Sequence, residues 1–388
     1  MDSKKLKAII IIIFILIIIS IIGLVLLLTL KKQKEDPQNI GLAPEFIENY
    51  MEENPSLVTQ NSTKTMFYSV QNCITNVEEV TASEVYLVES YQINKTYGEM
   101  YIAYALVEGK DSYYIINIDN TNKAFEIQKI EKNLYEKMRA GQIEQQYLEK
   151  KEIKQTANNE FSLFKVTDSN MSEVYLNRIN SLILYAPETL YNQLDEEYKK
   201  ERFHSQYSEF VEYCNLKKEQ IETSSITSYQ TEKVEDKKQY VCNDNYNNIY
   251  KIIEQDTINY TVMLDNYTIK TAEFKQKYEA SENKIKAVTN LDQFIRMVNG
   301  KDYKNLYQLL DDTFKQNNFS TEQAFVSYME QNFFDYNIPS LQNVEENSNN
   351  TFVYTITIKD KDSTSARSMN KTVVIRILED TNFVMSFN

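Results

Sequence analysis

Hydrophobic positions in the C-terminal part of the chain change from a helical period to an alternating one. Three stretches, 291–300, 306–319 and 320–334, have helical spacing, and the first carries its apolar face on Leu291, Phe294, Ile295 and Val298. After Pro339 the apolar residues alternate along 351–359, and residues 371–388 are expected to form two strands joined at 379–382. Helices followed by an antiparallel sheet predict an α+β domain.

The same order of elements occurs earlier in the chain, which indicates a repeat. The segment LYQLLDDTFKQNNF at 306–319 is expected to be one helix, and a related segment, LYNQLDEEYKKERF, begins 116 residues earlier (306 − 190). Residues 210–213 match 325–328 at an offset of 115 (325 − 210), and four strands are expected to follow. An acidic turn at Asp265 is placed opposite Asp380. A register shared by helices and strands predicts two copies of one domain.

A fainter third unit precedes these two. One helix at 62–77 and four strands, the last two joined at 119–122, predict a domain of related fold at 44–130. The charged stretch 131–170 is expected to be a helical connector. The two clearer domains are placed at 171–271 and 272–388, and the polar residues 31–43 are expected to form a linker.

An uncharged apolar run begins at Ala8 and ends at Leu30. At a rise of about 1.5 Å per residue it can cross a bilayer core of roughly 30 Å, so residues 8–30 are predicted to form a transmembrane helix that is not cleaved as a signal peptide. The tail, residues 1–7, carries Lys4, Lys5 and Lys7 and is expected to stay in the cytoplasm. The domains would then lie outside the cell membrane.

The charge of the chain limits the classes of partner. The formal net charge is −14, and residues 1–34 contribute +5, which leaves −19 (−14 − 5) for the rest. Such an acidic surface repels nucleic-acid phosphates, so no nucleic-acid partner is expected. The expected partners are the membrane, through residues 8–30, and proteins, including further copies of this chain.

The repeated core positions resemble a known superfamily. The pattern Y-x-x-L-Y-x-L-L-D-x-x-F at 303–314, then F-V-x-Y at 325–328 and a last strand FVMSF, is similar to NTF2-like (cystatin-like α+β) domains. The resemblance covers 171–271 and 288–388 and, less fully, 60–130. It implies helices packed on a curved antiparallel sheet, and it leaves the function open because this fold carries enzymes, binders and scaffolds.

A membrane anchor followed by tandem domains of this kind resembles two groups of Gram-positive envelope proteins. These are the VirB8/TcpC-like subunits of conjugation and type IV secretion channels and the TcaA-like envelope-stress proteins. The second group usually carries a zinc ribbon before its anchor, and residues 1–7 contain no Cys. The first group is therefore the favoured resemblance.

Few residues could carry catalysis. The six Gly are scattered, so no phosphate-binding loop or nucleophile elbow can be assigned. The single His, His204, would have to build a triad or a metal site alone. Asp195 and Asp311 recur at equivalent positions, but Glu196 and Asp312 follow them, which favours a solvated helix face. No catalytic, cofactor-binding or metal-ligating residue is expected, and the chain is predicted not to be an enzyme.

Cysteine and tyrosine are interpreted as packing residues. Three Cys are too few for a disulfide framework, Cys73 is expected in a core, and a bond between Cys214 and Cys242 is left open. The many Tyr residues of the strands are expected to pack in the sheets, with an aromatic binding surface for peptides or glycans as the alternative.

The leading functional hypothesis is a non-catalytic, membrane-anchored extracytoplasmic scaffold or interaction protein of the bacterial cell envelope, most like a conjugation-channel subunit. A ligand-binding or envelope-stress sensing module is the first alternative, and it predicts an open apolar cone lined by Tyr and Phe. A hydrolase or isomerase is the remote alternative, and it predicts a buried acid facing His204 or a Tyr. Leu310 is expected in the core of the last domain in every case.

Overall fold

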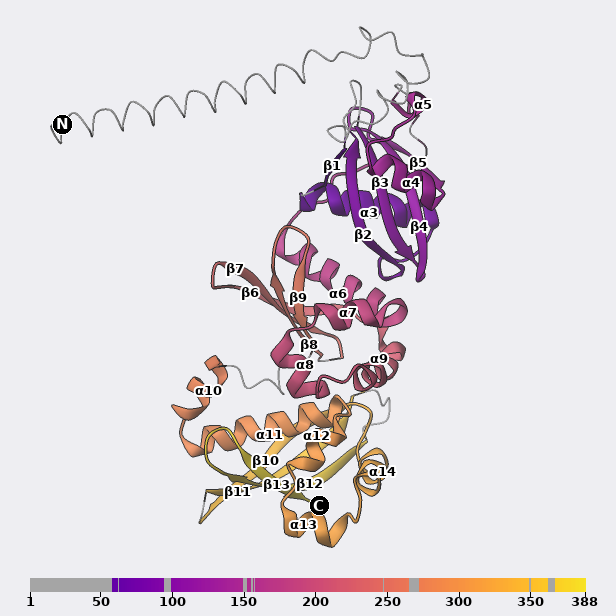
Figure 1. The fold of residues 1–388 in the computed structure, drawn as a ribbon. Coiled ribbons are helices and arrows are strands. Elements are labelled where there is room, and N and C mark those ends of the chain that lie inside the picture. The colour runs from indigo at the N-terminus through magenta and orange to yellow at the C-terminus, as the bar shows by residue number, and fades with distance from the viewer. Residues whose placement is uncertain are drawn as a thin grey trace, which may run out of the picture. The chain divides into compact units, whose positions relative to one another are not determined.

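The computed structural model describes residues 58–61, 63–93, 99–148, 152–154, 156, 158–246, 248–264, 272–348, 350–361 and 367–388. None of the helices within these ranges is long and apolar enough to span a bilayer. The predicted transmembrane helix at 8–30 and the linker at 31–43 lie outside them. Two compact units are present, one drawn from 1–61, 87–105 and 112–162, the other from 62–86, 106–111 and 163–388. The chain is α+β with antiparallel sheets (Figure 1).

The first unit contains most of a five-stranded sheet in which each strand pairs with the next one along the chain. Its strands are β1 (Val58–Gln60), β2 (Val85–Ile93), β3 (Glu99–Val107), β4 (Lys110–Asp119) and β5 (Ala124–Ile130). The outer ends of β2, β3 and β4 belong to the second unit, as do α3 (Lys64–Glu78) and the short helix η3 (Ala82–Glu84). The predicted helix and four strands of this region are confirmed.

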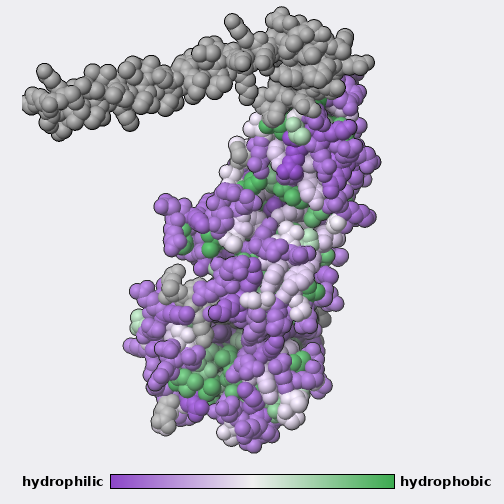
Figure 2. All heavy atoms as spheres, in the orientation of Figure 1, coloured by the Kyte–Doolittle hydropathy of each residue, from purple (hydrophilic) through white to green (hydrophobic). Residues whose placement is uncertain are grey.

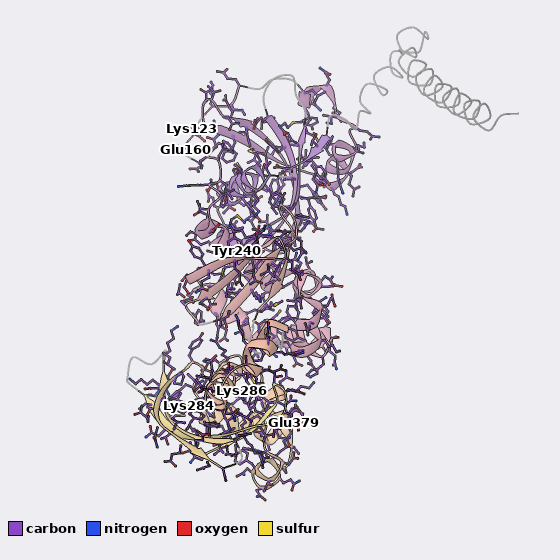
Figure 3. The ribbon with its side chains drawn as sticks, turned by 90° about the vertical axis from the view of Figure 1, so that its left-hand side faces the viewer. Lys123, Glu160, Tyr240, Lys284, Lys286 and Glu379 are labelled. Carbon is purple, nitrogen blue, oxygen red and sulfur yellow. The ribbon has the colours of Figure 1, made fainter. Side chains whose placement is uncertain are left out.

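The stretch predicted to be a charged helical connector, 131–170, contains two short helices, α4 (Lys132–Arg139) and α5 (Gln145–Leu148). Tyr135 and Met138 lie three residues apart on α4 and are buried in a core with the sheet residues Ile102 and Tyr113. Further along, Phe161 N–H donates to the Lys123 carbonyl at 2.8 Å, and Figure 3 labels Lys123 beside Glu160. This stretch is therefore packed against the sheet over part of its length.

The second unit contains two successive sets of elements in the same order, here called the middle and C-terminal domains. The middle domain comprises α6 (Asp168–Tyr185), α7 (Pro187–Gln193), α8 (Glu196–Phe203), α9 (Tyr207–Ile221), β6 (Ile226–Val234), β7 (Lys237–Asp244), β8 (Ile249–Glu254) and β9 (Tyr260–Met263). After α10 (Ala272–Glu279), the C-terminal domain comprises α11 (Asn283–Asn299), α12 (Tyr303–Gln308), α13 (Asp312–Asn318), α14 (Glu322–Asn332), β10 (Asn337–Asn347), β11 (Thr351–Asp360), β12 (Ser368–Ile377) and β13 (Phe383–Phe387). Both sheets are four-stranded and follow chain order.

The predicted single helix at 306–319 is wrong, because the chain breaks between α12 and α13. At the break Leu310 forms a parallel bridge with Met385 of β13, and Asp311 N–H donates to the Met385 carbonyl at 2.7 Å. The middle domain repeats this arrangement, with Leu194 bridged to Val262 of β9. In each domain a short extended segment between two helices therefore lies beside the last strand.

The acidic turn that precedes β9 of the middle domain is not the one predicted at Asp265. The turn before its closing strand lies at 256–259, where the Asp256 carboxylate accepts from the Ile258 and Asn259 amides at 2.9 and 2.8 Å. Asp265 follows β9 and lies outside the described residues. Because β6, β7 and β8 are shorter than β10, β11 and β12, the offset grows from 116 (310 − 194) at the helix break to 123 (385 − 262) at the last strand.

The predicted core of the C-terminal domain is confirmed. Leu310 is 1% exposed, and the apolar face of α11 packs with the inward face of β11, which carries Phe352, Tyr354, Ile356 and Ile358. Strand β10 was not predicted. It lies at the edge of the sheet and is exposed over most of its length, so its sequence lacks the alternation that marks a half-buried strand.

Candidate functional site

The recurring carboxylates, Asp195 and Asp311, are helix N-caps. The Asp195 carboxylate accepts from the Tyr198 amide at 3.0 Å, and the Asp311 carboxylate accepts from the Thr313 amide at 3.0 Å. Arg376 also binds Asp311, at 3.0 Å. Each Asp satisfies backbone donors that the helix start leaves free. The two positions therefore recur for a structural reason, although the caps do not lie on the helix faces that the sequence predicted.

His204 ends α8 in the left-handed region, with φ at 50°, and its side chain is 41% exposed. Its Nδ1 lies 2.9 Å from Oε2 of Glu209, whose other carboxylate oxygen binds Lys304. Partial burial acts to raise the pKa of Glu209, but hydrogen bonds from His204 and Lys304 lower it overall. His204 thus belongs to a charged cluster that joins the middle and C-terminal domains.

A buried ion pair lies beside this cluster. Arg202 of α8 and Asp302, at the start of α12, approach to 3.0 Å with side chains only 8% and 3% exposed. Asn305 donates to Asp302 at 3.1 Å and to the Arg202 carbonyl at 3.4 Å. Neither charged residue stands out in the sequence, because two residues that lie 100 positions apart (302 − 202) leave no periodic signal.

A cleft of about 370 Å³ lies between the same two domains. One wall comes from β6, the end of β7 and the start of β8, and the other from α11 and the start of β10. Asn299 and Asn337 hold the second wall: the Asn337 amide N–H donates to Asn299 Oδ1 at 2.9 Å, and Asn299 Nδ2 donates to the Asn337 carbonyl at 3.0 Å. Arg296 donates to Asp292 at 2.7 Å on the same wall.

The lining of the cleft combines polar and aliphatic side chains. Half of its lining residues carry amide or hydroxyl groups, among them Asn243, Asn248 and Tyr246. The one acid among the residues that line the cleft, Asp292, is 60% exposed and paired with Arg296. Within the described ranges, no group of three or more His, Cys, Asp or Glu residues could hold a metal ion.

Several groups that the sequence did not reveal join α3 and the start of β2 to the middle domain. The Arg178 guanidinium lies 4.1 Å from the centroid of the Tyr86 ring. Glu254 accepts from Tyr175 and from Lys64, both at 2.5 Å. The ring of Tyr240, labelled in Figure 3, lies edge-on to that of Tyr175 with the centroids 5.3 Å apart. Tyr residues of this domain thus pack in its core.

The three Cys residues, Cys73, Cys214 and Cys242, are free and buried, so no disulfide joins the last two. Burial raises the pKa of each thiol to about 12. Buried thiols with a raised pKa are poor nucleophiles.

Compared with protein-family models, curated proteins and solved structures, this chain matches nothing.

Proposed function

We propose that this protein is a non-catalytic scaffold or interaction protein of a bacterial cell envelope, anchored in the membrane through residues 8–30 and carrying tandem NTF2-like domains outside the cell. The observation that carries the proposal is the role of the repeated carboxylates as helix caps, because they were the best sequence candidates for an active site. Of the two resemblances seen in the sequence, a conjugation-channel subunit is the favoured one.

The junction between the middle and C-terminal domains supports a structural role. Separating Arg202 from Asp302 would leave two buried charges without a partner, which is strongly destabilising. The ion pair therefore holds the two domains in one arrangement. Scaffolds need such fixed spacing between binding surfaces, whereas an enzyme built from one domain does not.

The exposed surface of the C-terminal domain supports protein partners. In Figure 2 hydrophobic side chains gather over this domain, while most of the visible surface is hydrophilic. Large hydrophobic residues that are more than 40% exposed lie on α11 and β10: Ile285, Val288, Ile338 and Leu341. Strand β10 is an edge strand, and exposed edges can accept a further strand.

Crosslinking of the full chain in native membranes, followed by purification, tests the proposal. We expect a self-associated species or a defined protein partner. Leu341→Glu on β10 should weaken that association, whereas Leu163→Glu, which alters a residue that is 54% exposed in another part of the chain, should not. A chain that stays monomeric and retains no partner would count against a scaffold.

The interdomain cleft favours a second candidate, a ligand-binding or sensing module. Its paired amides are prearranged, which lowers the ordering cost of binding a polar neutral molecule. Titration with a panel of mono- and disaccharides tests this candidate. Saturable binding that Asn299→Leu abolishes would favour it, and binding that the substitution leaves unchanged would exclude this cleft.

A further inference from the structure

Lys371 is a half-buried cation on the helix-facing side of the C-terminal sheet. It pairs with Ile356 across β11 and β12, and paired residues share a face; Ile356 is 1% exposed. Its Nζ lies 5.1 Å from the Phe333 ring centroid and 5.8 Å from that of Tyr328. Burial lowers the pKa of the Lys371 ammonium. Among the residues that the structure describes, no carboxylate forms an ion pair with this ammonium.

The middle domain places an ammonium at the equivalent ring and satisfies it. Tyr213 of α9 corresponds to Tyr328 of α14 at the offset of 115 (328 − 213), and Lys217 Nζ lies 5.4 Å from the Tyr213 ring centroid. Lys217 donates to Asn248 Oδ1 at 2.6 Å, and Asn248 in turn donates to the buried carboxylate of Asp244 at 2.8 Å. The buried cation of the middle domain is therefore held by a buried amide, which a buried acid holds in turn.

Strand register shows what the C-terminal domain has at those two positions. Ile252 and Ile375 are equivalent, because each pairs with the residue that bridges to a helix break. Counting back four residues from each places Lys371, on β12, at the position of Asn248, which directly precedes β8. On the facing strand Ile356 pairs with Lys371, and extending the β7–β8 register by one pair beyond Asn243 and Ile249 sets Asp244 opposite Asn248, where the Asp244 N–H donates to the Asn248 carbonyl at 3.1 Å. The cation over the Tyr ring is thus retained, while the acid that balances it is replaced by an aliphatic residue.

A cavity of about 510 Å³ opens in front of Lys371. Phe333, Phe334 and Met369 provide its apolar wall. Both acids of its lining are solvent-exposed: Glu330 is exposed, and Asp335 is 88% exposed and paired with Lys301. Arg367 also lines the cavity, but it is 64% exposed and paired with Asp360, so Lys371 is the more buried of the two cations in the lining.

We propose that this cavity binds a small organic anion, with its carboxylate or phosphate on Lys371 and its apolar or aromatic body against Phe333, Phe334 and Met369. The anion takes the place of the acid that Asp244 provides in the middle domain. The proposal goes beyond a scaffold role and does not depend on it.

Calorimetric titration of the full-length protein with benzoate, phenyl phosphate and benzamide tests the proposal. At least one of the two anions should bind, and benzamide, which is neutral and similar in shape to benzoate, should bind at least tenfold more weakly. The difference between benzoate and phenyl phosphate identifies the head group. Equal binding of benzamide and both anions, or no binding of either anion at millimolar concentration, would overturn the proposal.

Matched variants assign the binding to Lys371. Lys371→Met keeps most of the side-chain stem and should weaken anion binding tenfold or more. Lys359→Met removes the same charge from an exposed position of the same sheet and should leave binding unchanged. Ile356→Asp restores the acid of the middle domain and should abolish binding while Lys371 is still present. Unchanged affinity in Lys371→Met would refute the assignment.

A measurement on the unaltered protein covers the case in which a variant fails to fold. Reductive methylation followed by mass spectrometry reports how fast each Lys reacts. Benzoate or phenyl phosphate should protect Lys371 and leave Lys359 unprotected. Equal protection of both residues, or of neither, would contradict the site.

Discussion

At the two helix breaks, Asp side chains replace backbone hydrogen bonds that the broken helix no longer makes. A helix start leaves four N–H groups without an intrahelical acceptor, and the Asp carboxylate is among the best side chains to accept a hydrogen bond from one of them. Asp195 is the N-cap residue of α8, and Asp311 is the N-cap residue of α13. An acid that recurs between repeats is therefore explained here by backbone geometry.

Asp311→Ala should lower the free energy of unfolding of the C-terminal domain by about 1 kcal/mol, as is typical of a lost N-cap. Asp312→Ala, one residue further along and exposed, is the matched control and should change it by less than about 0.5 kcal/mol. Urea denaturation followed by circular dichroism gives both values. Equal losses in the two variants would contradict the cap.

The three buried thiols should be inert to Ellman's reagent at pH 8 in the native protein and should react together on unfolding. Their pKa is about 12 in the folded chain, against roughly 8.5 in an unfolded one. The folded state binds the thiol protons more tightly than the unfolded state does. The free energy of unfolding is therefore unaffected by the thiols below about pH 8.5 and decreases as the pH rises toward 12. A thiol that reacts at once in the native state would disprove its burial.

At the scale of elements, alternation predicts only those strands that have one buried face. Strands β11, β12 and β13 bury alternate residues and were predicted correctly. Strand β10 was missed because most of its side chains are exposed on both faces, so its apolar residues do not alternate. The break between α12 and α13 was missed because Leu306, Leu310 and Phe314 keep a helical spacing across it. Periodicity does not reveal a backbone bridge to a strand some 75 residues away (385 − 310).

The bridge makes Leu310 a sensitive position. Leu310→Asp places an unpaired charge in the core and should destabilise the C-terminal domain by about 4 kcal/mol or more. Leu341→Asp makes the same change on β10, where the side chain is 53% exposed, and should have little effect. Differential scanning calorimetry compares the two variants. An unchanged melting temperature for Leu310→Asp would refute its place in the core.

At the scale of the whole molecule, sequence predicted the two repeated domains but neither the junction between them nor the two cavities. Arg202 and Asp302 meet only after both domains have folded, and each lies in a stretch that looks like an ordinary charged surface. Lys371 likewise looked like one charge on an alternating strand. Its significance depends on the absence of an acid across the sheet, which no local pattern contains.

A double-mutant cycle on Arg202→Met and Asp302→Asn measures the junction. Each single change leaves a buried charge unpaired and should cost about 3 to 5 kcal/mol, while the double variant should cost less than the sum. The exposed pair Lys233 and Asp236 is the control, with an expected coupling below about 1 kcal/mol. Additive effects at the buried pair would contradict the contact.

Acid should loosen the same junction. The lowered pKa of Glu209 means that its contribution to stability is present above an unfolded value of roughly 4.3 and is lost as the pH falls through the lower folded value. Glu209→Gln should therefore reduce stability at pH 7 and converge with the unaltered protein at low pH. Glu212→Gln, exposed on the same helix, is the control. Parallel curves for Glu209→Gln and the unaltered protein would contradict this role.

The order of the strands also has a consequence for folding kinetics. Every sheet pairs strands that follow one another in the chain, so it can grow by one hairpin at a time at a small cost in loop entropy. The bridges at the helix breaks are different, since they close loops of 68 (262 − 194) and 75 (385 − 310) residues. Closure entropy grows with the logarithm of loop length, so these contacts form late and at nearly the same cost in both domains. During synthesis, neither domain can finish folding until its own last strand has left the ribosome.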